Sequence, residues 1–274
     1  MSDITLIDDS EQSSLVTNGL AKNGEMYLKK AGSTDAGSIV VYDSGAWKTF
    51  ANEGGAFVNA YSLSYDGADD RMNVSNDSSL QFATGGFTWS AWIKVTTAKT
   101  NTVVRRATGA NGYQFVVNSG GQIAYYGGNS GYAFVTLAPS GSISTNTWHH
   151  VAFTHDRTNV KGYVDGVNNA VWDRVDSYIP VLADTTIGYN SSAASYTFAG
   201  LIDEVSVFNS ALSASDISTI YNGGTLNDIS SLNPIGWWRM GDDDGGTGAT
   251  ITDQGSAGND GTLTNGPVFS SDVP

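Results

Sequence analysis

Apolar and polar residues alternate in many short stretches of this chain, and turns rich in glycine, aspartate and asparagine separate them. Such alternation predicts half-buried β-strands, because successive side chains of a strand face opposite sides of the sheet. Residues 87–93 are apolar on both faces, which favours a central position in a sheet. We predict strands over residues 26–29, 38–42, 47–50, 61–65, 87–93, 103–106, 113–117, 122–126, 148–155, 160–164, 185–189 and 202–208.

A single short helix follows the last of these strands. Ser213 is a natural N-cap, and Asp216 three residues later matches a capping box. Ile217, Ile220 and Tyr221 form the apolar face of this helix. Gly223 and Gly224 are expected to end it. The predicted fold class is all-β, a two-sheet antiparallel jelly-roll sandwich with one short helix and a small N-terminal β appendage.

The chain divides into two predicted parts. Residues 1–55 comprise a polar arm and a β-hairpin, and they are too few to bury a core of their own. This appendage is therefore expected to dock on the main domain, on another copy or on a different protein. Residues 56–274 hold the dense strand pattern of the sandwich.

Charge and composition exclude several partners. The 274 residues include 27 acidic and 13 basic side chains, a net charge of -14, which argues against nucleic acid and against an anionic membrane surface. The chain has no cysteine and therefore no disulfide framework. The first residues have neither the basic nor the apolar region of a signal peptide, so we expect no such signal.

Four segments carry a resemblance to a known family. They are residues 63–70, residues 87–93, residues 148–153 with 163–166, and residues 200–221. In this order they resemble laminin-G-like, concanavalin A-like lectin domains over residues 60–224. The resemblance implies two antiparallel sheets, one of them concave, and a binding function, since only some relatives cut their ligands.

The C-terminal residues 237–265 resemble the segment that usually opens such a domain. Two interpretations fit this position. The segment adds a closing, permuted strand to the same sandwich, or it is the stub of a second copy that could not fold alone. We favour the first, because such a strand would cover an exposed sheet edge.

The layout also resembles structural proteins of tailed bacteriophages, in which a segment like residues 37–47 precedes a lectin-like domain. It implies a virion surface protein, a capsid decoration or a fibre, assembled in the host cytoplasm. Residues 1–55 would contact other virion proteins and the chain's own copies, and the sandwich would face cell-surface glycans. A purely structural scaffold and a polysaccharide depolymerase are the alternatives.

Catalysis is not expected. Laminarinase-type relatives carry two glutamates in an E-x-D-x-x-E strand motif, because glycosidic cleavage needs a close acid and nucleophile. The four glutamates here, Glu11, Glu25, Glu53 and Glu204, are never three or four residues apart. Asp203 and Glu204 are adjacent on a strand, and adjacent strand residues are expected to face opposite sides. We therefore predict a non-enzymatic protein.

Calcium is the predicted ligand ion. Asp66, Asp69 and Asp70 crowd one turn, and hard cations prefer several carboxylate and carbonyl oxygens. In the family, a structural Ca²⁺ near such a turn is common, and Asp203 could complete the site from a neighbouring strand. The alternative is that the turn aspartates bond backbone amides, and that residues 242–244 form a solvated loop.

Aromatic and histidine side chains are the remaining candidates for binding. The loop aromatics Tyr132, Trp172 and Tyr178 are the predicted sugar platform, because sugar rings stack their C–H faces on aromatic rings. The three histidines, residues 149, 150 and 155, lack the spacing of a zinc site. They are expected to be solvated or hydrogen-bonded residues near strand ends.

Overall fold

Two compact units follow each other along the chain in the computed structural model, residues 1–58 and residues 59–274. The structure describes residues 57–82, 85–108, 111–128, 133–139, 141–173, 181–191 and 194–274, and the backbone of four strands before residue 51. The boundary lies three residues beyond the predicted one at residue 55.

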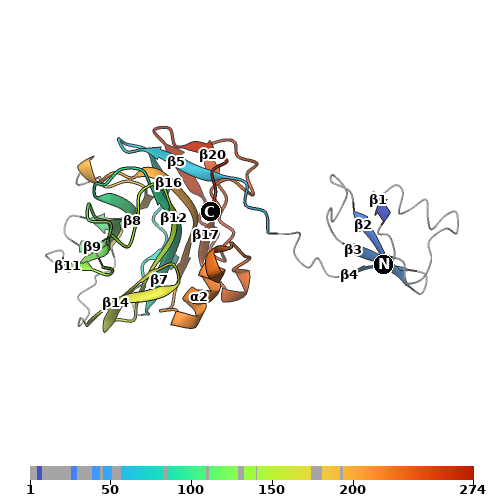
Figure 1. Cartoon of the computed structure of the whole chain (residues 1–274), viewed down its shortest axis with the longest axis horizontal. Coiled ribbons are helices and arrows are strands. Elements are labelled where there is room, and N and C mark those ends of the chain that lie inside the picture. Colours follow the sequence, from blue (N-terminus) through green and yellow to red (C-terminus); the bar gives the residue numbers. More distant parts are fainter. Residues whose placement is uncertain are drawn as a thin grey trace. The chain divides into compact units, whose positions relative to one another are not determined.

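The first unit contains a four-stranded sheet (Figure 1). Its strands in spatial order are β1 (Thr5–Ile7), β2 (Met26–Lys29), β3 (Ile39–Asp43) and β4 (Ala46–Phe50). The predicted hairpin corresponds to β3 and β4, which pair in antiparallel register from Ile39 with Phe50 to Asp43 with Ala46. The three-residue strand β1, which pairs in parallel with β2, lies in the segment that was predicted to be a polar arm.

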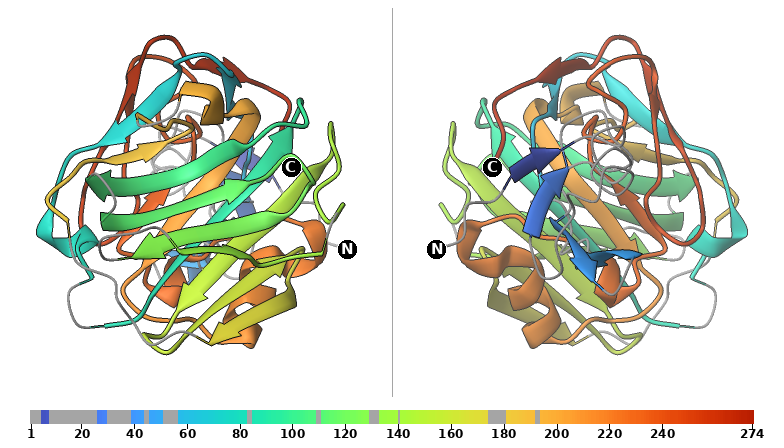
Figure 2. Two further views of the ribbon diagram at one scale, coloured as in Figure 1. Left: turned by 90° about the vertical axis from the view of Figure 1, so that its left-hand side faces the viewer. Right: turned by 90° about the vertical axis from the view of Figure 1, so that its right-hand side faces the viewer.

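The second unit is a two-sheet sandwich in which all described pairings are antiparallel (Figures 1 and 2). Sheet 1 has the order β11 (Ala133–Thr136), β10 (Ile123–Gly128), β9 (Asn111–Val117), β8 (Asn101–Thr108), β15 (Thr185–Ile187), β6 (Arg71–Val74), β19 (Gly261–Thr264) and β18 (Thr250–Ile251). Sheet 2 has the order β14 (Val167–Asp173), β13 (Asn159–Val164), β12 (Trp148–His155), β7 (Phe87–Val95), β16 (Ala199–Phe208), β5 (Ser62–Asp66) and β20 (Val268–Ser270). A further strand, β17 (Gly236–Trp238), pairs with β16.

The predicted fold class is confirmed, and β7 is a central strand as expected. It lies between β12 and β16, so both of its edges are hydrogen-bonded. Trp89 and Ile93 point into the core between the sheets. Trp92 faces the outer side of sheet 2, where the Tyr221 ring stacks on it at 5.8 Å between centroids. Both faces of β7 are therefore packed.

The short helix α2 (Ala214–Tyr221) begins as predicted. The Ser213 side chain accepts a hydrogen bond from the Asp216 amide, and the Asp216 carboxylate accepts one from the Ser213 amide. The helix ends one residue earlier than the glycines suggest, because Asn222 itself adopts the left-handed conformation at φ 45°. The remaining helices of the described residues are short 3₁₀ turns, η1 (Ser78–Leu80), η2 (Ala194–Tyr196), η3 (Asn222–Gly224) and η4 (Ser230–Leu232). None of the described helices has the length and apolar character needed to span a membrane.

The C-terminal segment belongs to the same sandwich, but it adds more than the one predicted closing strand. It contributes β18 and β19 to sheet 1 and β17 to sheet 2, and β20 lies beyond the predicted range at the edge of sheet 2. Trp238 is fully buried and stacks on Trp89, with 6.1 Å between ring centroids. The end of the chain therefore completes both layers and part of the core.

We expect Trp238→Ala to lower the free energy of unfolding by about 3–5 kcal/mol, because a large buried ring leaves a cavity that the core cannot refill. The measurement is urea unfolding followed by fluorescence and circular dichroism. Val268→Ala, at a side chain that is 63% exposed, is the control and should change stability by less than about 0.5 kcal/mol. Equal stability of the two variants would show that the C-terminal segment is not part of the core.

Candidate functional site

The turn between β5 and β6 gathers three of the predicted metal ligands. Asp66, Asp69 and Asp70 each offer one carboxylate oxygen, and these oxygens lie within 4.8 Å of one another. Gly67, at φ +80°, allows the tight turn that brings them together. We call residues 66–70 the acidic turn. The structure therefore brings the three predicted carboxylates together in one turn.

Hydrogen bonds within and around the acidic turn use one oxygen of each carboxylate. Asp70 accepts from the Asp66 amide at 2.9 Å, and Asp66 accepts from the Ala68 amide at 2.7 Å. Asp69 accepts from the Asn265 side chain at 2.8 Å. Burial raises the pKa of Asp70, and the like charges of Asp66 and Asp69 add to this effect. The turn is thus both self-bonded, as the alternative interpretation expected, and crowded with negative charge.

Lys99 links the acidic turn to a neighbouring pocket. Its ammonium donates to the Gly67 carbonyl at 2.9 Å and to the Thr197 hydroxyl at 3.1 Å. Burial lowers the pKa of Lys99, and the charge of Asp66 opposes that shift. Lys99 was not predicted from the sequence, because its partners come from segments that are 32 and 98 residues away.

The same lysine lines a cavity of about 200 Å³, which we call the rim pocket. Three segments enclose it, from the end of β7, the turn between β9 and β10, and the residues before β12. Its lining consists of Val95, Thr97, Ala98, Lys99, Val117, Asn118, Ser119, Gly120, Gly121, Gly141, Ile143 and Thr145. The pocket and the acidic turn are therefore neighbours at one end of the sandwich.

Asp203 does not complete the acidic turn, and this prediction is corrected. In the β5–β16 pairing it is Ala199 that lies opposite Asp66. Asp203 is four residues further along β16, about 13 Å away in an extended strand. Its carboxylate instead accepts hydrogen bonds from the Asn59 side chain and the Glu204 amide.

A β-bulge in β16 also overturns the expectation that Asp203 and Glu204 face opposite sides. The β16–β7 register shifts between Asp203 and Ser206, and Glu204 has a φ of +47°. Ile202 and Val205 point into the core on either side of the pair. The extra residue therefore leaves both carboxylates on the outer face of sheet 2.

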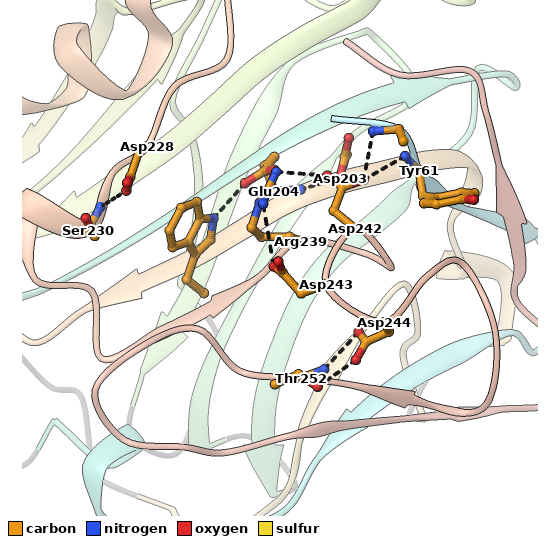
Figure 3. Close-up of polar contacts among 12 residues, drawn as sticks. Tyr61, Asp203, Glu204, Asp228, Ser230, Arg239, Asp242, Asp243, Asp244 and Thr252 are labelled. Carbon is orange, nitrogen blue, oxygen red and sulfur yellow. Dashed lines mark hydrogen bonds and ion pairs between the residues drawn. The ribbon is translucent and has the colours of Figure 1, made fainter. Parts of the chain in front are cut away.

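These two carboxylates are sealed in a polar network (Figure 3). Glu204 accepts from the Trp237 indole at 2.6 Å and from the Arg239 guanidinium at 3.0 Å. Arg239 also pairs with Asp242 at 3.0 Å. Asp242 accepts the backbone amides of residues 60 and 61 at 2.7 and 2.9 Å. The loop at residues 242–244, for which a solvated loop was the alternative interpretation, thus begins with a buried carboxylate, that of Asp242.

Burial dominates the electrostatics of this network. It raises the pKa of Asp203 well above the usual carboxyl range, and the neighbouring Glu204 charge adds to the effect. Burial raises the pKa of Glu204 to about 7, although Arg239 and the Trp237 hydrogen bond oppose it. Asp203 is 0% exposed and Glu204 6% exposed. Their carboxyl groups are closed off from a polysaccharide chain.

Of the predicted sugar platform, the structure describes only Trp172. Trp172 lies on the edge strand β14 and packs against the hydrophobic core. Tyr132 and Tyr178 lie outside the described residues. The acidic turn and the rim pocket are therefore the best-defined candidate site in the described part of the chain.

All three histidines are hydrogen-bonded, as predicted: the His150 ring bonds the Ser90 hydroxyl at 2.7 Å, and the His155 ring accepts from the Arg157 amide at 3.2 Å. His150 is fully buried, its ring contacts Trp92 and Tyr221, and burial lowers its pKa to about 4. His149 bonds Asp165 at 2.9 Å, as expected for a hydrogen-bonded histidine. His155 is buried and stacks on Phe87. These contacts hold strands and helix together rather than forming a metal site.

A family model described as the concanavalin A-like lectin/glucanases superfamily, in its laminin-G form, matches residues 66–218, which is more than half of the chain. The chain belongs to this superfamily. The match contains the acidic turn, the rim pocket and the Asp203–Glu204 pair of this laminin-G-like chain. A search of curated protein sequences finds no match.

Comparison of this laminin-G-like chain with solved structures gives matches of low sequence identity. A Bacteroides ovatus protein, provisionally described as carbohydrate binding, is 19% identical with a TM-score of 0.60, over 91% of this chain and 70% of its own. The heptameric SAP-like pentraxin of Limulus polyphemus is 15% identical with a TM-score of 0.47, over 60% of this chain and 82% of its own. The binding domain of botulinum neurotoxin serotype D is 20% identical with a TM-score of 0.47, over 60% of this chain and 42% of its own.

We expect Asp203→Asn to stabilise the protein by on the order of 1 kcal/mol at about pH 8, with a smaller gain at about pH 5. The pKa of Asp203 is raised in the folded state. Its contribution to the free energy of unfolding is therefore fully present below the unfolded pKa of about 3.9 and is lost as the pH rises through the folded pKa. The side-chain oxygen of Asn59 is buried and has no partner among the described residues. After a flip of the Asn59 amide group, this oxygen can accept a hydrogen bond from the introduced asparagine.

Urea unfolding at both pH values checks this expectation. Asp228→Asn, at an exposed aspartate that accepts a hydrogen bond from the Ser230 amide, is the matched control. If Asp203→Asn were less stable than the parent at about pH 8, the raised pKa of the buried Asp203 would be contradicted.

Proposed function

We propose that this chain is a non-catalytic glycan-binding module whose ligand site is the end of the sandwich that carries the acidic turn and the rim pocket. The observation that carries the proposal is the convergence of three carboxylates beside a pocket, joined by Lys99. The carbohydrate-binding description of the Bacteroides ovatus protein with the same fold supports it.

The proposed cofactor is Ca²⁺ at the acidic turn. Carboxylate oxygens are its preferred ligands, and a cation would offset the negative charges of Asp66 and Asp69, which add to the effect of burial in raising the pKa of Asp70. Asp66, Asp69 and Asp70 would each supply an oxygen, and neighbouring carbonyl oxygens and water would complete the shell. The bound ion would fix the turn beside the pocket and so shape the site for a sugar.

The proposed lack of catalysis rests on the Asp203–Glu204 pair. They are the only pair of adjacent acidic residues on a strand within residues 200–221, one of the segments that carry the family resemblance. Trp237, Arg239 and Asn59 bond their carboxylates. A hydrolase needs its acid and nucleophile on either side of an accessible glycosidic bond. Release of reducing sugar from any polysaccharide by the purified chain would overturn this part of the proposal.

The proposed setting is the surface of a virion, with residues 1–55 attached to other virion proteins or to further copies of the chain. Two observations support it. The N-terminal residues form a compact unit apart from the sandwich, divided at Val58. The order of a short β segment followed by a lectin-like domain resembles bacteriophage structural proteins. A capsid decoration and a fibre are the two forms of this proposal.

We expect Ca²⁺ to raise the stability of the protein by about 1.4 kcal/mol when its concentration is tenfold above its Kd. We also expect Asp69→Asn to remove most of this gain, because the exposed Asp69 supplies an oxygen while its bond to Asn265 can persist through the amide oxygen. The measurement is thermal unfolding with and without EDTA. Asp228→Asn should retain the full effect, and an equal effect in both variants would exclude the acidic turn as the site.

Glycan binding provides the functional readout. We expect the full chain to bind members of a glycan array and to lose that binding in EDTA, because the acidic turn borders the pocket. The Asp69→Asn variant should lose binding in parallel, and Asp228→Asn should keep it. An array without any binding, together with stable incorporation into particles, would favour the purely structural scaffold instead.

Removal of residues 1–58 should leave a folded sandwich, because residues 59–274 form a compact unit whose described core residues all lie after residue 62. We expect its melting temperature to stay within a few degrees of the parent value. The truncated chain should bind glycans as the full chain does and should no longer join particles. Incorporation of the truncated chain would contradict the proposed attachment role.

A further inference from the structure

A short segment before β5 is fastened to the Asp203–Glu204 network, and we call this segment, residues 59–61, the strap. The Asn59 side chain donates to the Asp203 carboxylate at 2.9 Å. The amides of residues 60 and 61 donate to one oxygen of Asp242 at 2.7 and 2.9 Å (Figure 3). The polar contacts of the strap are therefore made to carboxylates.

Outside these bonds the strap has a light hold on the sandwich. The Tyr61 ring meets the Phe269 ring edge to face, with 6.3 Å between centroids. It also lies against Gly246, where an added Cβ would come within 2.5 Å of the ring. All three strap residues are only partly buried, and the described hydrophobic core begins at Leu63. The strap can therefore detach without removing a side chain from the core.

The network that holds the strap contains more carboxylates than cations. Glu204 and Asp242 both pair with the Arg239 guanidinium at 3.0 Å, and Asp243 lies 3.5 Å from the same group. The printed donors to Asp203 are uncharged amides. A buried carboxylate that lacks a cation is unstable when it is ionised. The closed network is therefore favoured when the Asp203–Glu204 pair carries a proton.

The strands beside the network do not supply the missing cation within the described residues. On β7, Trp92 lies opposite Asp203, and Lys94 is paired with Asp272 at 2.6 Å. On β12, His150 lies against Trp92, and burial lowers its pKa to about 4, so its ring is neutral above that pH. The strap and β17 contribute amide, phenol and indole groups. Arg239 is thus the cation that serves the network.

Proton binding differs between the closed and the open network. Burial raises the pKa of Glu204 to about 7 and holds the pKa of Asp203 well above the usual carboxyl range, and the bond from Asn59 opposes this shift without cancelling it. In water both carboxyl groups return to a pKa of about 4. The closed network therefore binds more protons than the open one. Its advantage is fully present below about pH 4 and is lost as the pH rises through the folded pKa values, from about pH 7 upward.

We propose that the strap is a pH-dependent fastening, closed at neutral and acidic pH while the Asp203–Glu204 pair carries a proton and released at alkaline pH while the sandwich stays folded. This inference goes beyond the proposed function and does not depend on glycan binding. The strap comes directly after Val58, where the two units of the chain divide. Its release adds three residues, about 10 Å of extended chain, to the connection between the units. The pH therefore sets the reach of the N-terminal unit.

Amide hydrogen exchange of the ¹⁵N-labelled full chain measures the release directly. The amides of residues 60 and 61 are protected by their bonds to Asp242 and exchange when these bonds open. After correction for the intrinsic rate, we expect their opening constant to rise between about pH 7 and 9, by about tenfold per pH unit for each proton released. Amides of β7 and β16 should stay protected. An opening constant that is independent of pH, or an equal rise throughout both sheets, would overturn the inference.

Two substitutions connect the release to the carboxylate pair. Asp203→Asn and Glu204→Gln each remove one titrating group, and at about pH 9 we expect an opening constant at residues 60 and 61 at least tenfold below that of the parent. Asp228→Asn, at an exposed aspartate outside the network, should show the same rise as the parent. Because there are two pair variants, misfolding of one leaves the other as the test. A reduced pH dependence in a folded pair variant supports the inference, and a parent-like rise in both overturns it.

Discussion

Two buried carboxylates on the outer face of sheet 2 are the constraint on which the rest of the sandwich depends. A carboxylate that is removed from water is unstable unless it is protonated, paired or hydrogen-bonded. Glu204 is satisfied by Trp237 and Arg239, and Asp203 by Asn59. These partners come from the first residues of the sandwich and from its C-terminal segment, so one polar network ties both to the strand β16.

The two groups of acidic side chains, the Asp203–Glu204 network and the acidic turn, therefore differ in their surroundings. The Asp203–Glu204 network uses its charges internally, and its burial accounts for the raised pKa values of both carboxyl groups. The acidic turn keeps two of its three carboxylates at the surface, since Asp66 and Asp69 are exposed and Asp70 is buried. A rigid, fully packed sandwich that presents loops at one end is a common basis for recognition.

The comparison with known proteins supports the fold and leaves the ligand to experiment. Membership of the superfamily rests on a match over residues 66–218, and the Bacteroides ovatus structure with the same fold is 19% identical. Function on a shared fold depends on the site. For this reason the proposals rest on the acidic turn, Lys99 and the rim pocket.

The sequence by itself determined the local features of this protein. Alternation predicted most strands, the Ser213–Asp216 capping box predicted the helix start, and the spacing of Asp66, Asp69 and Asp70 predicted their convergence, because each depends on residues a few positions apart. Only the tertiary structure decided which face Glu204 takes, where Asp203 lies, which sheets the C-terminal strands join and that Lys99 borders a pocket. The bulge in β16 depends on pairing with β7, and the pocket depends on three distant segments meeting, so neither is encoded in a short stretch of residues.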